Sequence, residues 1–273
     1  MEDARSCSTR HSDEPCDVVL YGASEEDTQF ERQDSGSSSY SDLVRWKDRD
    51  ETLIIFDWDD TLCPTSSAEA ALGTDLEEHA RLAELVLRVA STLGHVEIVT
   101  MAGVGWVEET IQRYMPNMRS VLEELQIPVR LARENVPLSC KREAFADCRD
   151  PSVYMKRRTI RQVVTDFYGS TTCVTGKPRS WKNVLSIGDS DAERLALQDV
   201  MWWRVQRGNG GRWKMCRCKS VKLKQEPSVT ELSAQLLQLA QLLPTCVQHN
   251  DDLDLMFDDD AANLAHQKVE CPV

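Results

Sequence analysis

Three aspartates follow a short apolar run in the first quarter of the chain. Asp57, Asp59 and Asp60 come directly after LIIF at 53–56, within the stretch FDWDDTLCPT. Carboxylates this close repel one another, and burial strengthens the repulsion because it removes their solvation. A bound cation is the usual compensation. The stretch therefore predicts a cation site at the end of a buried strand.

Two cations compete for this site. The pattern Asp57-x-Asp59-x-Thr61 opens like a calcium-binding EF-hand loop. However, Leu62 takes the place of the glycine needed at the sixth position, and Ala68 that of the glutamate needed at the twelfth. The stretch also follows a predicted strand rather than a helix. These departures exclude the EF-hand and favour Mg²⁺.

The elements that must position these aspartates alternate between strands and helices. This alternation predicts βαβ units and a mainly parallel sheet covered by helices on both faces, a Rossmann-like three-layer α/β sandwich. Thr74 with Glu77, and Ser228 with Glu231, have the spacing of helix capping boxes. The predicted strands are 53–56, 95–100, 128–132, 183–189 and 220–224, and the predicted helices are 74–93, 107–115, 117–126, 141–149, 152–167, a helix from 192 and a helix from 229.

Polar side chains lie at the carboxyl ends of three of these strands. Asp57 and Asp59 follow the first, Thr100 ends the second, and Asp189 ends the fourth. Ligands of parallel sheets bind beyond the carboxyl ends of the strands, so we expect these residues to meet at one edge. Oxygen ligands of this kind suit Mg²⁺ together with a phosphate. One aspartate can then act as a nucleophile and a second as a general acid and base.

These residues resemble the motifs of the haloacid dehalogenase (HAD) superfamily. DWDDT is similar to its first motif, Asp-x-Asp-x-Thr after an apolar strand. IVT, ending in Thr100, resembles the second motif, and VLSIGDSDAE resembles the fourth. Order and strand context agree over roughly residues 50–245.

The resemblance implies a role for each matching residue. Asp57 would attack phosphorus and form an aspartyl-phosphate, and Asp59 would act as general acid and then base. Thr100 would hydrogen-bond a phosphoryl oxygen. The Mg²⁺ shell would comprise Asp57, the backbone carbonyl of Asp59, Asp189 and a further acid. Together these roles describe a phosphoric monoester hydrolase.

Two positions of the family pattern are left open by the sequence. The further acid of the fourth motif is Asp191 or Glu193, and the spacing favours Glu193. The family's third motif is a lone lysine without a signature. Lys141 at the start of a predicted helix is favoured over Lys182, which precedes the strand and lies at its wrong end. Lys156 and Lys177 are less well placed.

The spacing of the motifs leaves no room for a large cap domain. Only 43 residues separate Asp57 from Thr100, and 41 separate Thr100 from Lys141. By analogy with capless relatives, we expect an open site and a large substrate such as a phosphoprotein. Trp58 and Trp106 are expected to pack in the core, although Trp106 is close enough in sequence to cover the site.

Charge is segregated along the chain. The formal net charge of −13 argues against a nucleic-acid partner, yet residues 201–224 carry eight basic residues and no acidic one, while residues 251–260 carry six aspartates. The basic segment 204–224 would bind an acidic phosphoprotein, a nucleic acid or the acidic tail, and in the last case the tail would cover the site. We expect a disordered Ser-rich acidic tail at 1–48, a HAD-like domain at 49–248 and an acidic tail at 249–273.

The remaining features concern the compartment and an alternative function. The first ten residues lack the apolar core of a secretory signal, no run reaches the length of a membrane span, and the ten cysteines form no framework, so we expect an intracellular, cytoplasmic protein. Cys216, Cys218, Cys246 and His249 are zinc-ligand types with poor spacing. The alternative to a phosphatase is a HAD-like binding or scaffold protein without activity.

Overall fold

The computed structural model shows an α/β fold built on a parallel sheet. The described residues are 47–135, 150–169, 183–202, 206–207, 213–214 and 216–257, and all of them belong to one unit, Ser39–Val273. The predicted helix at 141–149 therefore lies outside the described residues, as does the predicted tail at 1–48 except for its last two residues.

Six strands form the sheet in the order β3-β2-β1-β4-β7-β8, and every neighbouring pair is parallel. The switch in strand order lies between β1 and β4, where the chain leaves one half of the sheet for the other. The six strands are β1 (Thr52–Phe56), β2 (His95–Thr100), β3 (Val129–Leu131), β4 (Asn183–Gly188), β7 (Arg217–Lys222) and β8 (Leu253–Met256). Two further short strands, β5 (Gln206–Arg207) and β6 (Trp213–Lys214), pair with each other.

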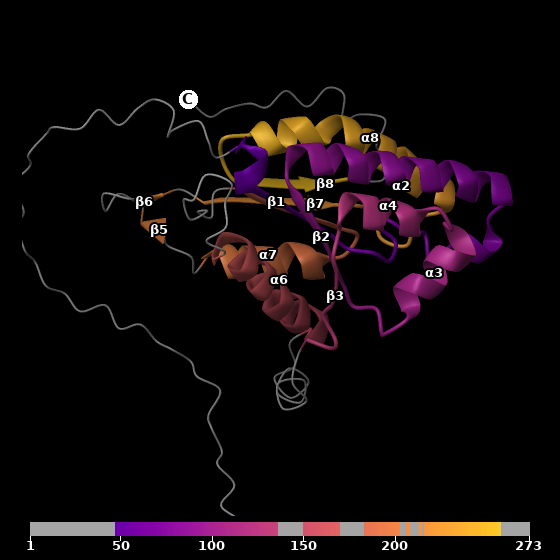
Figure 1. Cartoon of the computed structure of the whole chain (residues 1–273), viewed down its shortest axis with the longest axis horizontal. Coiled ribbons are helices and arrows are strands. Elements are labelled where there is room, and N and C mark those ends of the chain that lie inside the picture. Colours follow the sequence, from indigo (N-terminus) through magenta and orange to yellow (C-terminus); the bar gives the residue numbers. More distant parts are fainter. Residues whose placement is uncertain are drawn as a thin grey trace, which may run out of the picture. The chain divides into compact units, whose positions relative to one another are not determined.

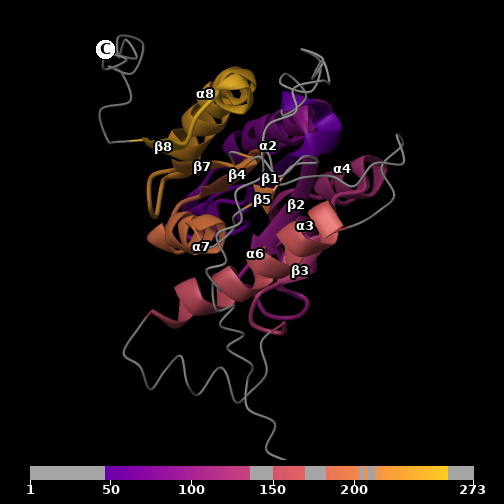
Figure 2. The ribbon, with the colours of Figure 1, turned by 90° about the vertical axis from the view of Figure 1, so that its left-hand side faces the viewer.

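Helices cover both faces of the sheet (Figures 1 and 2). On one face α2 (Gly73–Leu93) lies beside α8 (Val229–Gln248), together with α3 (Trp106–Tyr114) and α4 (Met118–Leu125). On the other face α6 (Pro151–Gly169) packs beside α7 (Asp191–Trp202). Two short 3₁₀ turns, η2 (Arg49–Glu51) and η3 (Ala68–Ala70), flank β1 and the loop after it.

The alternation of β1 produces these two apolar cores. Ile54 and Phe56 face the core under α2 and α8, whereas Leu53 and Ile55 face the core under α6 and α7. Successive side chains of a strand point to opposite faces, so a strand buried on both sides reads as a continuous apolar run. The three-layer Rossmann-like prediction is thus confirmed at the level of the fold.

Capping boxes were predicted at the first residues of α8 and α2, and only one of them is present. The Ser228 hydroxyl accepts a hydrogen bond from the Glu231 backbone N–H, and the Glu231 carboxylate accepts one from the Ser228 backbone N–H, so the capping box of α8 is confirmed. The box predicted at Thr74 is wrong. Helix α2 begins one residue earlier, at Gly73, with Leu72 as its N-cap and no side-chain cap hydrogen bond.

The last strand differs from the sequence prediction. Residues 253–256, assigned to an acidic tail, form β8 and pair with β7 from Lys219 to Lys222. Leu253 and Leu255 pack against the α2–α8 core, while Asp254 accepts hydrogen bonds from Arg194. A single alternating stretch of two leucines among aspartates was too short to stand out from the charge around it. The domain therefore extends past residue 248.

Candidate functional site

The carboxyl ends of β1, β2 and β4 bring the predicted polar residues together. Strand β1 pairs with β2 on one side and β4 on the other, and the backbone N–H of Asp57 donates to the carbonyl of Ile187, 2.9 Å away. This register places the loop after β1 between Thr100 at the end of β2 and Asp189 after β4.

Three carboxylates converge at this edge. Asp57, Asp189 and Glu193 each offer an oxygen, and these oxygens all lie within 4.8 Å of one another. Asp57 and Glu193 are almost fully buried, with exposed fractions of 6% and 4%. Three oxygen ligands at this spacing could hold a metal ion, and a hard cation such as Mg²⁺ prefers such ligands.

Lys156 supplies a positive charge to this cluster from α6. Its Nζ lies 3.0 Å from Asp57 Oδ1 and also contacts Glu193 Oε1. The side chain is buried, on the helix face that carries Thr159, Ile160 and Val163. The spacing of Lys156 with the apolar face of α6 is the sequence signal for this position, although Lys156 was predicted to be less well placed than Lys141. The favoured Lys141, as well as Lys177 and Lys182, lies outside the described residues.

The acid contributed by α7 is Glu193. Its Oε2 accepts hydrogen bonds from the Ser190 backbone N–H and hydroxyl, at 3.1 and 2.7 Å, which aims the other oxygen at Lys156. Asp191 turns away and pairs with Lys222, 3.0 Å distant, with 56% of its side chain exposed. The spacing argument for Glu193 over Asp191 therefore agrees with their positions.

Gly188 makes room for Glu193. A Cβ on Gly188 would lie 2.4 Å from Glu193 Cγ, well inside van der Waals contact. The last residue of β4 must therefore lack a side chain for the glutamate to reach back under the strand end.

Electrostatics of the cluster favour an additional cation. Burial raises the pKa of Asp57, and the charge of Lys156 opposes that rise. Burial, reinforced by the negative charge of Asp57, raises the pKa of Asp189 to about 7. One ammonium group thus does not offset three neighbouring carboxylates, and a divalent cation would keep them ionised. The donor set consequently fits a metal such as Mg²⁺.

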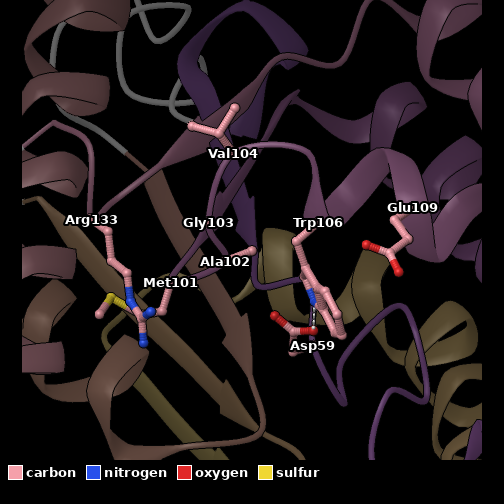
Figure 3. Close-up of a pocket in the computed structure, with 8 residues that line it drawn as sticks. All are labelled: Asp59, Met101, Ala102, Gly103, Val104, Trp106, Glu109 and Arg133. Atoms are coloured by element: carbon pink, nitrogen blue, oxygen red, sulfur yellow. Dashed lines mark hydrogen bonds between the residues drawn. The ribbon is translucent and has the colours of Figure 1, made fainter.

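Asp59 is held apart from this cluster by two donors. Trp106 Nε1 donates to Asp59 Oδ1 at 2.8 Å (Figure 3). The Thr100 hydroxyl donates to Asp59 Oδ2 at 3.4 Å. Thr100 is itself fixed by the backbone N–H of Ala102, which donates to its hydroxyl at 3.0 Å. Thr100, at the end of β2, therefore meets Asp59 at the carboxyl edge of the sheet, as predicted.

The two tryptophans near the site have different environments. Trp58 is fully buried and donates to the Thr110 hydroxyl at 2.9 Å, which confirms the expected core packing. Trp106 is 40% exposed, so the core prediction is wrong for this residue. It is the first residue of α3 and follows Gly105, whose positive φ of 85° is accessible to glycine and turns the chain toward Asp59.

The third aspartate of the motif organises the loop. Asp60 has a φ of 51°, and its Oδ1 accepts a hydrogen bond from the Ser66 backbone at 2.9 Å and one from the Thr65 hydroxyl at 3.4 Å. Asp60 thus stabilises the turn after β1.

A buried histidine connects this loop to the helices above it. His79 Nε2 lies 2.9 Å from the Leu62 carbonyl, and Nδ1 lies 3.1 Å from the Ser233 hydroxyl. Because a carbonyl only accepts, Nε2 carries the hydrogen and Nδ1 accepts from Ser233. Burial lowers the pKa of His79, which keeps the ring neutral. No motif in the sequence indicates this contact.

A pocket of about 530 Å³ opens beside Asp59 (Figure 3). Its walls come from the loop after β1, the segment between β2 and α3, the first turn of α3 and the turn after β3. Besides Asp59, the residues that line it are Met101, Ala102, Gly103, Val104, Trp106, Glu109 and Arg133.

Three other features of the sequence can be compared with the described residues: the Cys and His ligand types, the basic segment and the question of a membrane span. Among the described residues, the only group of three or more potential metal ligands is the Asp57 cluster, so Cys216, Cys218, Cys246 and His249 form no such group. The described part of the basic segment includes β7, which pairs with the acidic β8 along the sheet rather than at the strand ends. No described helix has the length and apolarity needed to span a membrane.

Comparisons with known proteins do not assign the chain to a group. No family model matches it, and no curated protein or solved structure shows significant similarity to it.

Proposed function

We propose that this protein is a Mg²⁺-dependent phosphatase of the HAD type, acting through an aspartyl-phosphate. The observation that carries the proposal is the convergence of Asp57, Asp189 and Glu193 around Lys156 at the carboxyl edge of the sheet. The order of the motifs along the chain and the parallel sheet that presents them support the HAD-like assignment.

The first half of the reaction forms a bond between an Asp57 carboxylate oxygen and phosphorus. As the bond from phosphorus to the leaving oxygen breaks, protonated Asp59 donates its proton to that oxygen. Lys156 beside Asp57 limits the repulsion between the carboxylate and the incoming phosphate dianion. The Thr100 hydroxyl, close to Asp59, is placed to donate to a phosphoryl oxygen.

The second half releases inorganic phosphate. Asp59, now ionised, takes a proton from a water molecule as the water oxygen bonds to phosphorus. The bond between phosphorus and Asp57 then breaks, which restores both carboxyl groups to their starting states. Asp59 therefore acts first as acid and then as base.

Asp57, Asp189 and Glu193, with the backbone carbonyl of Asp59, would hold the Mg²⁺ ion directly or through water. The ion would supply charge neutralisation for the transferring phosphoryl group. For the substrate we keep the expectation of a phosphorylated molecule, including a phosphoprotein, in an intracellular setting.

Hydrolysis of p-nitrophenyl phosphate by purified protein, with and without Mg²⁺, tests the proposal. Asp57→Asn and Asp59→Asn should abolish turnover. Asp60→Asn is the matched control, because asparagine keeps the acceptor for Ser66 and tolerates the positive φ of this loop position. It should retain activity.

A binding measurement distinguishes an inactive relative from an enzyme that rejects this ester. Beryllium fluoride should bind in a Mg²⁺-dependent manner and raise the melting temperature, and Asp57→Asn should remove that shift. Folded protein that neither turns over the ester nor responds to beryllium fluoride would favour a binding or scaffold role instead.

A further inference from the structure

The pocket beside Asp59 has an apolar, aromatic wall. Trp106 is 40% exposed and Val104 is 79% exposed, although both are large apolar residues and both line the pocket. Met101 adds a flexible thioether on the opposite side, next to Arg133 (Figure 3). Exposed apolar side chains gathered around a hollow mark a ligand site more often than a bare surface.

Trp106 connects this wall with Asp59, the proposed general acid. The indole N–H is directed at Asp59 Oδ1, 2.8 Å away, so the edge of the ring lies at the carboxyl group that would protonate the leaving oxygen. The remainder of the ring lines the pocket. A group attached to that oxygen therefore enters the pocket beside the indole.

Nearby residues keep the pocket open at this point. Gly103 has nothing within 4 Å of the position a Cβ would occupy. The turn at Gly105 places Trp106 at the start of α3, facing Asp59 rather than the core. The volume of about 530 Å³ exceeds that of a phosphate group and falls within the range of small-molecule sites.

We propose that this pocket is a leaving-group subsite that selects phosphate monoesters carrying an aromatic ring. Trp106 and Val104 form the surface on which the ring packs, and Arg133 contributes positive charge at the opposite side. The inference rests on the proposed phosphatase function and adds the substrate class to it. Two kinds of ligand carry such an aromatic phosphate: a phosphotyrosine side chain and a free aryl phosphate ester.

Non-hydrolysable phosphonates allow the contribution of the ring to binding affinity to be measured without turnover. Binding of phenylphosphonate and methylphosphonate to the full chain is measured by calorimetry with and without Mg²⁺. Both share the phosphonate group, so their affinity ratio isolates the ring. Packing against an indole should make phenylphosphonate about tenfold tighter.

Matched substitutions at Trp106 assign that preference. Trp106→Phe keeps an aromatic wall and loses the N–H, so it should retain most of the ratio. Trp106→Ala should reduce the ratio to within about twofold of unity, because the stacking surface is gone. If Trp106→Ala does not fold, Val104→Ser, at a mostly exposed position, should still lower the ratio by about threefold.

The results distinguish this inference from the function on which it rests. Mg²⁺-dependent binding of both phosphonates with equal affinity would overturn the aromatic subsite and leave the phosphatase proposal standing. Failure of the folded protein to bind either would overturn both. A peptide and a free amino acid that carry the same phosphonomethyl-phenyl group then identify the source: tighter peptide binding indicates phosphotyrosine in a polypeptide, and equal binding indicates a small aryl ester.

Discussion

The ammonium group of Lys156 lies 3.0 Å from Oδ1 of Asp57, and both side chains are buried. Lys156 belongs to α6, a helix on one face of the sheet, whereas Asp57 follows the central strand β1. Their contact means that the charge of Asp57, the proposed nucleophile, depends on the packing of α6 against the sheet.

Replacement of Lys156 by Met should therefore impair both activity and stability. Loss of a charge at the phosphoryl site should lower kcat by at least about a hundredfold. Removal of one partner from a buried ion pair should cost about 3–5 kcal/mol in unfolding free energy, and added Mg²⁺ should restore part of it. Denaturant titration with and without Mg²⁺ measures the second effect. Lys222→Met, which removes a partner of Asp191 outside the cluster, is the control and should leave kcat nearly unchanged.

Substitution of Trp106 by Phe should alter the dependence of rate on the leaving group. Without the N–H, Asp59 loses the donor that orients its carboxyl group. An alkoxide needs the proton from Asp59, whereas p-nitrophenolate departs without it, so kcat for ethyl phosphate should fall about tenfold more than kcat for p-nitrophenyl phosphate. Steady-state kinetics on the two esters provide the test. Equal losses on both would show that Trp106 only supports the fold.

Addition of one methyl group at Gly188 should weaken metal binding. Alanine there would clash with Glu193 and push its carboxylate out of the cluster. We expect Mg²⁺ affinity to fall about 10–100-fold, as for other disturbances of metal-site geometry. Calorimetric titration of Gly188→Ala is compared with Gly73→Ala, where the new Cβ meets nothing within 4 Å. Unchanged affinity in Gly188→Ala would exclude Glu193 as a metal ligand.

His79 should make the protein less stable in mild acid. Its pKa is lowered in the folded state, so the unfolded chain takes up the proton first as the pH falls. The contribution of neutral His79 is present above about pH 6.5 and declines below it, by up to about 1.4 kcal/mol per pH unit. Unfolding free energies of the protein and of His79→Phe between pH 5 and 8 should converge toward low pH. If His79→Phe kept the pH slope of the unchanged protein, His79 would not be its source.

Truncation at the C-terminus should reveal the contribution of β8. Arg194 and Ser220 both donate to Asp254, which fixes the strand against α7 and β7. A chain that lacks 250–273 should melt several degrees lower than one that lacks only 258–273. Thermal melts of the two truncations give this difference. Higher turnover or altered salt dependence in the shorter chain would instead support the acidic segment as a cover of the site.

The sequence predicted the parallel sheet well because its central strands are continuous apolar runs that end in conspicuous polar residues. Strand β2 was predicted with its observed bounds, and β1 to within one residue. Strand β8 escaped because an edge strand with alternating Leu and Asp has the composition of an acidic tail. Its stability comes from partners, such as Arg194, that are distant in the chain.

The positions of site residues were predicted where they follow a strand or begin the next helix, as Glu193 does, and were missed where they come from a helix farther along the chain. Asp57, Thr100 and Asp189 are located by strand ends, which meet at one edge in any parallel sheet. Lys156 comes from a helix, and its position depends on how that helix rotates and docks. Trp106 is similar: its orientation depends on the turn at Gly105, and exposed or buried tryptophans look alike in a sequence.

The pairing of β1 with β4 also governs when the protein first acquires its site. Asp57 is made early during synthesis, while Asp189 and Glu193 follow only after the whole first half of the sheet and α6. A growing chain therefore presents Asp57 without its two partner carboxylates until β4 pairs with β1, and long-range parallel pairing of this kind forms slowly. Metal uptake during refolding would thus report the insertion of β4, and not the earlier collapse of the β1–β2 half.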